Sequence, residues 1–173
     1  MADFKEIFEK TLENEGGYVL HEVPGDLGGM TYAGISRKNW PNWYGWELID
    51  SGKPDEVVQL AVYSFYVESF WERLDGWSID NERIAYSLYD FAVNVGVRTA
   101  VKKAQPVFDF LDCDGIVGEH TLKALNTVDQ SWFLADFTLR KIDYYRSICN
   151  KNKSQSKFLL GWINRTMRVH DGQ

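Results

Sequence analysis

The sequence predicts a mainly α-helical protein with a small β element inserted after the first helix. Over most of the 173 residues, apolar side chains recur at three- and four-residue steps, as they do along the buried face of a helix. The exception is the stretch 18–36, where β-branched and aromatic residues surround Pro24 and several glycines. That composition is typical of a short hairpin or an irregular sheet. We expect an N-terminal lobe over residues 1–75 and a helical C-terminal lobe over residues 76–173, packed as one unit.

Each predicted element has its own local signal. The first helix is expected over residues 3–15, because Phe4, Phe8 and Leu12 share one stripe and two glycines follow it. The Trp-rich segment 39–49 predicts a loop or a short helix. Further helices are expected from Pro54 to Trp71, over 82–95 and over 119–127. The apolar pattern after Gly96 predicts that helical structure continues to Leu111 despite Pro106. A long helix is expected last, with an apolar stripe formed by Trp132, Ala135, Leu139, Ile142 and Tyr145.

Charge and composition exclude several classes of partner. The net charge of -6 argues against a protein that binds nucleic acid by neutralising phosphates. No apolar run is long enough for stable membrane insertion, and the start "MADFKEIFEK" lacks the order of a signal peptide, so synthesis in the cytoplasm is expected. Cys113 and Cys149 match no redox or metal motif and are expected to be free thiols.

A carboxylate occurs where the first helix should end. Glu15 follows Leu12 by three residues and so continues the apolar stripe, whereas Glu13 lies off it. Loss of hydration on that stripe favours the neutral acid, the form that can donate a proton in general acid catalysis. The same spacing also allows Glu15 to turn into solvent at a frayed helix end.

A general acid that cleaves a glycosidic bond needs a second carboxylate. Asp26, in "PGDLGG", lies in a turn whose glycines let the backbone approach a ligand. Thr31 follows five residues later, with a hydroxyl that could hold a water molecule. The alternative is that Asp26 only stabilises its own turn.

Several spaced motifs resemble one known family. The stretch "ENEGGYVLHEVPGDLGGMTYAGIS" resembles the N-terminal signature of the glycoside hydrolase family 108 muramidases. Three later stretches, "DFAVNVGVRTAVKKAQ", "DCDGIVGEHTLKALN" and "FLLGWINR", resemble the peptidoglycan-related C-terminal half of that family. The resemblance implies a lysozyme-like fold and hydrolysis of the β-1,4 bond between N-acetylmuramic acid and N-acetylglucosamine in peptidoglycan. It also implies that Glu15 is the general acid and that Asp26 and Thr31 position and activate the hydrolytic water.

The chain departs from the family pattern just before the second carboxylate. The loop from Tyr18 to Asp26 is longer than usual, and Leu27 replaces a common proline. Glu22, inside that loop, is therefore the alternative second carboxylate. We expect inversion at the anomeric carbon, with the two carboxyls ~6.5–9.5 Å apart.

Aromatic and polar side chains complete the predicted site. Tyr32, Trp43 and Tyr44 are expected to stack on sugar rings, although such residues also build cores. Asp90 and Asn94, at i and i+4 of an otherwise apolar helix, should hydrogen-bond either at the cleft or to each other. No metal or other cofactor is expected, because Lys123 occupies the position where a calcium loop starting at "DCDG" would need its glutamate.

The sequence therefore predicts a monomeric N-acetylmuramidase that cuts bacterial peptidoglycan strands in the periplasm or cell wall. Its export would use a holin or a secretion apparatus, for phage-type lysis or for wall remodelling. One alternative is a peptidoglycan-binding module without catalysis, which would not need Glu15. Another is an amidase or peptidase, which would need zinc or a Cys/His pair in a spacing that is not found.

Overall fold

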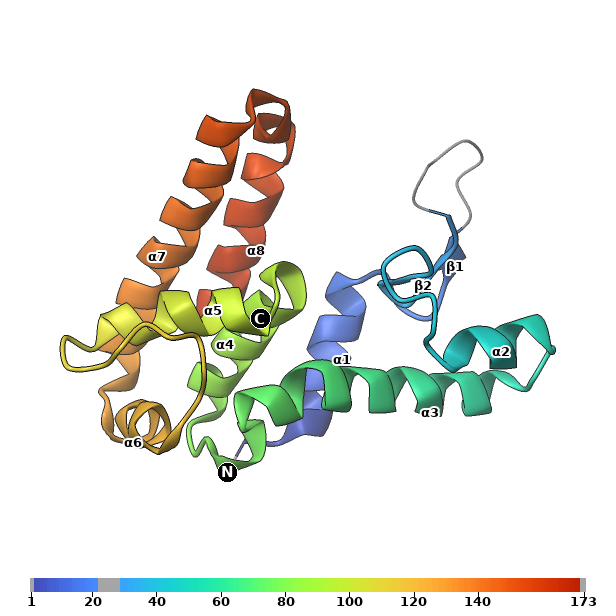
Figure 1. Cartoon of the computed structure of the whole chain (residues 1–173), viewed down its shortest axis with the longest axis horizontal. Helices are drawn as coiled ribbons and strands as arrows, with labels where there is room; N and C mark the ends of the chain where they lie inside the picture. The colour runs from blue at the N-terminus through green and yellow to red at the C-terminus, as the bar shows by residue number, and fades with distance from the viewer. Residues whose placement is uncertain (1, 22–28, 172–173) are drawn as a thin grey trace. The chain divides into compact units, whose positions relative to one another are not determined.

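The computed structural model describes residues 2–21 and 29–171, and within them the chain is mainly helical (Figure 1). The helices are α1 (Phe4–Asn14), α2 (Gly45–Asp50), α3 (Asp55–Tyr66), α4 (Glu82–Val95), α5 (Val97–Ala104), α6 (Glu119–Thr127), α7 (Gln130–Lys151) and α8 (Leu159–Asp171). The strands are β1 (Leu20–His21), β2 (Thr31–Tyr32) and β3 (Ile35–Ser36). This composition confirms the predicted fold class. The described part contains no helix that is both long and apolar enough to cross a bilayer.

The chain divides into two compact units. One consists of Phe4–Ser69, and the other of Met1–Asp3 with Phe70–Gln173. The first holds α1, the sheet, α2 and α3, and the second holds the remaining helices. The lobe boundary expected at residues 75 and 76 stays a prediction.

Helix α1 buries a stripe that differs slightly from the predicted one. Phe4, Ile7, Phe8 and Thr11 are buried, whereas Leu12 is only half-buried. The stripe therefore runs through Thr11, a β-branched residue whose methyl group packs as an apolar one. Apolarity alone could not identify this position, because a threonine reads as polar in a hydropathy pattern.

The small sheet has the order β1-β2-β3 and is antiparallel throughout. Leu20 pairs with Tyr32, and Tyr32 pairs with Ile35. Between β2 and β3 the chain reverses through Ala33 and Gly34, whose φ angles are 48° and 77°. Positive φ at both central residues defines the type I′ hairpin turn, which suits the twist of paired strands. The described residues of the stretch 18–36 thus confirm the expected small sheet.

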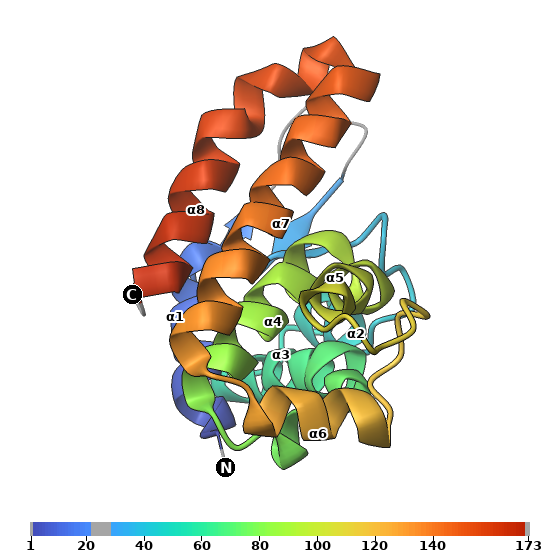
Figure 2. The ribbon, with the colours of Figure 1, turned by 90° about the vertical axis from the view of Figure 1, so that its left-hand side faces the viewer.

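The second unit is built around α4, whose residues Ile84 to Ala92 are all buried. Helices α5, α7 and α8 pack against it. Both views show α7 and α8 lying side by side as a hairpin (Figures 1 and 2). The predicted bounds 82–95 and 119–127 coincide with α4 and α6.

Two helical predictions for this unit were wrong. The helix expected to reach Leu111 ends at Ala104, and Pro106 lies in a 3-10 turn, because proline has no N–H for the helical ladder. In α7, Trp132 and Leu139 are exposed. The buried positions are instead Phe133, Leu134, Phe137, Thr138, Lys141, Tyr145 and Cys149. The lysine and threonine on this face conceal its periodicity in the sequence.

Candidate functional site

Glu15 is held at the C-terminal cap of α1. Its amide donates to the carbonyl of Thr11 at 3.0 Å, which continues the helical course beyond Asn14. Gly17 N–H then donates to Leu12 O at 2.9 Å and Gly16 N–H to Glu13 O at 3.1 Å, the two bonds of a Schellman motif. Because both glycines have positive φ, the motif forms without strain. The backbone at Glu15 is thus capped rather than frayed.

The side chain of Glu15 lies against the β2–β3 turn. A Cβ atom added to Gly34 would lie 2.9 Å from both Cβ and Oε2 of Glu15. The same point lies 2.7 Å from the hydroxyl oxygen of Tyr66. Gly34 therefore has no room for a side chain, and its absent Cβ lets the carboxyl, the turn and the phenol come together.

Tyr66 fixes that turn from α3. Its ring is buried, and its hydroxyl donates to the carbonyl of Ala33 at 2.9 Å. A buried hydrogen bond of this kind costs more to break than its net contribution suggests, because the carbonyl would lose its partner. The end of α1, the β2–β3 turn and α3 thus contact one another beside Glu15 and form a wall there.

Neither Tyr66 nor Gly34 was predicted as part of the site. Tyr66 belongs to the aromatic run "YSFYVESFW", in which no local signal separates a functional ring from a packing one. Gly34 carried a weak signal, since an isolated glycine within a segment of β propensity, here "TYAGIS", predicts a bulge or a close backbone approach.

Thr31 and the second carboxylate complete the predicted catalytic group. Thr31 is half-buried in β2, where it pairs with His21 on one side and Ser36 on the other. The strand that holds Thr31 leads directly into the turn against Glu15. Asp26 and its alternative Glu22 lie outside the described residues, so their roles stay predictions.

The three predicted sugar-stacking residues differ in exposure. Tyr32 is buried, with its ring centre 6.4 Å from that of Tyr18. Burial raises the pKa of the Tyr32 phenol, and nearby Asp55 raises it further, so the hydroxyl stays protonated near neutral pH. Trp43 is half-buried. Tyr44 is 62% exposed and offers an open ring face.

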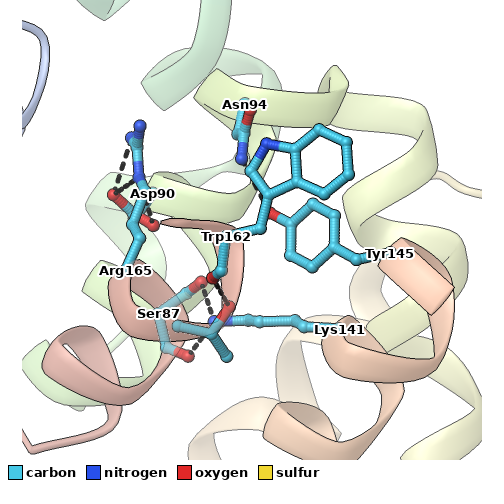
Figure 3. A network of polar contacts seen from close by, with 8 residues as sticks. Ser87, Asp90, Asn94, Lys141, Tyr145, Trp162 and Arg165 are labelled. Atoms are coloured by element: carbon cyan, nitrogen blue, oxygen red, sulfur yellow. Dashed lines mark hydrogen bonds and ion pairs between the residues drawn. The ribbon is translucent and has the colours of Figure 1, made fainter. Parts of the chain in front are cut away.

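Asp90 and Asn94 both have partners within the helical unit (Figure 3). Asp90 is buried and its carboxylate pairs with Arg165, whose Nη2 lies 2.9 Å from Asp90 Oδ1. The Asn94 side-chain amide donates to the Tyr145 hydroxyl at 2.7 Å. The expected hydrogen bonds therefore join α4 to α7 and α8, rather than Asp90 to Asn94. This geometry suits the structural alternative, and a glycan contact by either residue stays a prediction.

Metal-ligating side chains do not gather in the described residues. No group of three or more His, Cys, Asp or Glu is placed there to hold an ion. Cys113 is exposed, Cys149 is buried, and both are free thiols. Among the described residues, the predicted group that could take part in catalysis is Glu15, which is half-buried at the capped end of α1 beside the short sheet.

A mainly helical chain that places a glutamate at the end of its first helix, against a small antiparallel sheet, is a lysozyme-like protein. Residues 8–96 match the family described as Glycosyl hydrolase 108. Residues 97–167 match the family described as Predicted Peptidoglycan domain. The chain belongs to the glycosyl hydrolase 108 family, which confirms the resemblance in its motifs. It is a glycoside hydrolase of peptidoglycan.

A solved structure supports the fold. The structure of Brucella abortus SagA is similar, with a TM-score of 0.73 and 24% sequence identity. The similarity covers 97% of this chain and 91% of that chain. No curated protein sequence matches the chain.

Proposed function

We propose that this protein is an N-acetylmuramidase that hydrolyses the β-1,4 bond between N-acetylmuramic acid and N-acetylglucosamine, with Glu15 as general acid. The observation that carries the proposal is the position of the Glu15 side chain. Its backbone is capped by the Schellman motif, and its carboxyl group lies against Gly34 of the β2–β3 turn. A carboxyl group held in one place, and only half exposed to water, is what proton transfer to a leaving oxygen requires.

The proposed reaction is a single displacement. Glu15 gives its proton to the glycosidic oxygen while the bond from that oxygen to the anomeric carbon breaks. A water molecule attacks the anomeric carbon from the opposite face and loses its proton to Asp26, with Thr31 holding that water by a hydrogen bond. After the reaction Glu15 is ionised and Asp26 is protonated. Proton exchange with solvent returns both carboxyls to their starting states.

A binding module without catalysis is the less favoured function. The capped end of α1 and the bare Cα of Gly34 make room for a carboxyl group that a binding module would not need. A zinc peptidase is not favoured either, because no group of three or more His, Cys, Asp or Glu in the described residues is placed to hold the ion. We also propose that the enzyme acts in the periplasm or cell wall, where its substrate lies, and that a holin or secretion apparatus provides its export.

The products of digestion test the bond specificity. Purified peptidoglycan is digested with the protein, and the new reducing ends are identified by mass spectrometry after borohydride reduction. Reduced muramic acid is expected. Reduced N-acetylglucosamine would assign the other glycosidic bond, and free stem peptides would assign a peptidase or amidase.

The anomeric configuration tests the mechanism. Proton NMR of a soluble glycan fragment during the first turnovers should show the α anomer of muramic acid before mutarotation, because the water attacks opposite the leaving group. A β anomer formed first, or a glycosyl adduct trapped on Asp26, would contradict inversion.

A further inference from the structure

A groove on the unit Phe4–Ser69 has the chemistry of a sugar-binding site. It encloses about 560 Å³ between the loop before α2 and the exposed face of α3. Its aromatic lining comes from Trp43, Tyr44 and Phe65. Its polar lining includes Asn42, Ser64 and Glu68. We call these six residues the α3 groove.

Helix α3 separates the α3 groove from Glu15. Tyr66 and Val62, which are one helical turn apart, are both buried, and Tyr66 contacts the β2–β3 turn. Ser64 is two residues from each of them and is exposed. Because successive helical residues are rotated by about 100°, Ser64 points to the opposite side of the helix from Tyr66. A ligand in the groove therefore lies on the other face of α3 from the proposed general acid.

The aromatic wall of the groove is fixed before any ligand binds. The Trp43 ring contacts Trp46 edge to face at 5.1 Å and Phe65 at 6.0 Å, and its indole N–H lies 3.4 Å from the Ala61 carbonyl. The ring also covers Gly45, where a Cβ would lie 2.1 Å from a ring carbon. Trp43 can thus offer a ring surface to a ligand at little entropic cost.

The polar groups of the groove are available to a ligand. Within the described part of the chain, no side-chain hydrogen bond engages Asn42, Ser64 or Glu68. Together they offer an amide, a hydroxyl and a carboxylate beside the exposed ring of Tyr44. A pyranose presents an apolar C–H face for stacking and a rim of hydroxyl and acetamido groups for hydrogen bonds, which matches this lining. The Glu68 carboxylate and the net charge of -6 disfavour an anionic ligand.

We propose that the α3 groove is a second glycan-binding site, which holds an N-acetylated sugar of a peptidoglycan strand away from Glu15. The proposal rests on the proposed function for the identity of the glycan. An acidic enzyme gains little affinity from bulk charge on its polymer substrate. A second glycan contact would keep the enzyme on an insoluble wall between cleavage events, because two linked sites raise the effective concentration of the strand.

Retention on peptidoglycan tests the groove. In the Glu15→Gln background, which prevents digestion, the fraction that sediments with insoluble sacculi gives an apparent Kd. Tyr44→Ala and Glu68→Ala should each raise that Kd by about 3- to 10-fold, as expected for loss of one aromatic contact or one charged hydrogen bond. Tyr44→Phe should retain affinity because it keeps the ring. Glu56→Ala, which replaces an exposed glutamate of α3 that does not line the groove, is the matched control.

Competition and turnover distinguish the possible outcomes. A soluble N-acetylglucosamine tetramer should displace the Glu15→Gln protein from sacculi, and should do so less well after Tyr44→Ala. In the active enzyme, Tyr44→Ala should lower turnover of sacculi by at least about fivefold more than turnover of short soluble fragments. Equal losses on both substrates would place the groove within the catalytic cleft and overturn a second site. Displacement by free stem peptides instead of the sugar would make the ligand a peptide, and unchanged retention would overturn the proposal.

The test is independent of the catalytic assignment. Each variant replaces an exposed side chain, so thermal melts should match that of the parent. If the wild-type protein releases no muramic acid ends yet its retention depends on Tyr44 and Glu68, the proposed reaction fails while the groove stands.

Discussion

The most direct prediction concerns the side chain of Glu15. Glu15→Gln keeps the shape of the side chain but removes its acidic proton. Lysis of cell walls should fall by roughly 100-fold or more, with the thermal melt unchanged. Turbidity loss of a wall suspension measures this effect, and Glu13→Gln, an exposed neighbour, is the control. Near wild-type lysis by Glu15→Gln would place the acid elsewhere.

Crowding at Gly34 can be separated from backbone strain. Gly34→Ala forces positive φ on alanine and places a methyl group within 3 Å of Glu15 and Tyr66. Gly52→Ala imposes a similar φ of 64° with no atom within 4 Å of the new Cβ. Both variants should lose about 1–2 kcal/mol of stability to strain. Only Gly34→Ala should also lose activity, and equal activities in the two variants would contradict the assigned role of the turn.

The Tyr66 hydroxyl donates to the turn that lies against Glu15, and we therefore treat Tyr66 as a positioning residue. Tyr66→Phe keeps the ring but leaves the Ala33 carbonyl without this donor. Unfolding should become easier by about 1 kcal/mol. We expect kcat to fall by about tenfold with little change in KM, because a misplaced acid affects proton transfer more than binding. A variant that loses stability but keeps its kcat would show that Tyr66 is only structural.

At the scale of single residues, the sequence predicts those features that depend on neighbouring positions in the chain. Glu15 could be singled out because the helix period and the two following glycines are both local signals. The ion-pair partner of Asp90 could not be predicted in this way, since Arg165 is 75 residues away in the sequence. Tyr66 is similarly distant from the turn that it holds, 33 residues earlier in the chain.

At the scale of elements, α7 is joined to α4 by a buried lysine. Lys141 is 2% exposed and donates to the Ser87 carbonyl at 2.9 Å and to the Ser87 hydroxyl at 2.8 Å. Its ammonium group lies 4.5 Å from the centre of the Phe137 ring. Burial lowers the pKa of Lys141 from 10.5 to about 7, while Asp90 raises it and Arg165 lowers it. Figure 3 shows the lysine directed at Ser87.

This lowered pKa gives the stability a pH dependence. Between pH 7 and about 10, the unfolded chain holds a proton on Lys141 that the folded chain has released, so stability rises with pH by up to about 1.4 kcal/mol per unit. Below pH 7 both states hold the proton and this contribution is flat. Above pH 10 the buried Tyr145, whose pKa burial raises, begins to oppose the trend. Urea unfolding at pH 7 and pH 9 should therefore give a higher free energy at pH 9.

Lys141→Met isolates that effect. Methionine fills similar space without a charge to bury, so the variant should be at least as stable as the wild type at pH 7. Its stability should change little between pH 7 and pH 9. A variant with the same rise as the wild type would assign the pH dependence to another group.

Helices were predictable where apolar side chains still mark most of the buried face, as Ile84, Leu88 and Phe91 do in α4. The bounds of α4 and α6 follow from apolar periodicity and from the glycines that flank them. The face of α7 was misplaced because Lys141 and Thr138 belong to its core, and their burial depends on partners in α4 and α8. Tertiary packing overrides the local pattern at such positions.

At the scale of the whole molecule, the proposed chemistry uses only carboxyl, hydroxyl and water groups. Treatment with EDTA should leave wall lysis unchanged, and the double variant Cys113→Ser, Cys149→Ser should stay active. Cys149 is buried, so activity is best compared well below the melting temperature of the variant. Activity lost on chelation and restored by zinc would instead support a peptidase.

The size of the sheet sets how the wall beside Glu15 responds to thermal motion. Each strand contains two residues, and few backbone bonds hold them, with Arg37 N–H to Met30 O at 2.8 Å extending the pairing by one. Such a sheet can open locally at a free energy far below that of global unfolding. Native-state hydrogen exchange should therefore show weak protection at residues 31–37 and strong protection along α4. Local opening of β2 and β3 would change the surface beside Glu15 while the Schellman motif at the end of α1 stays formed.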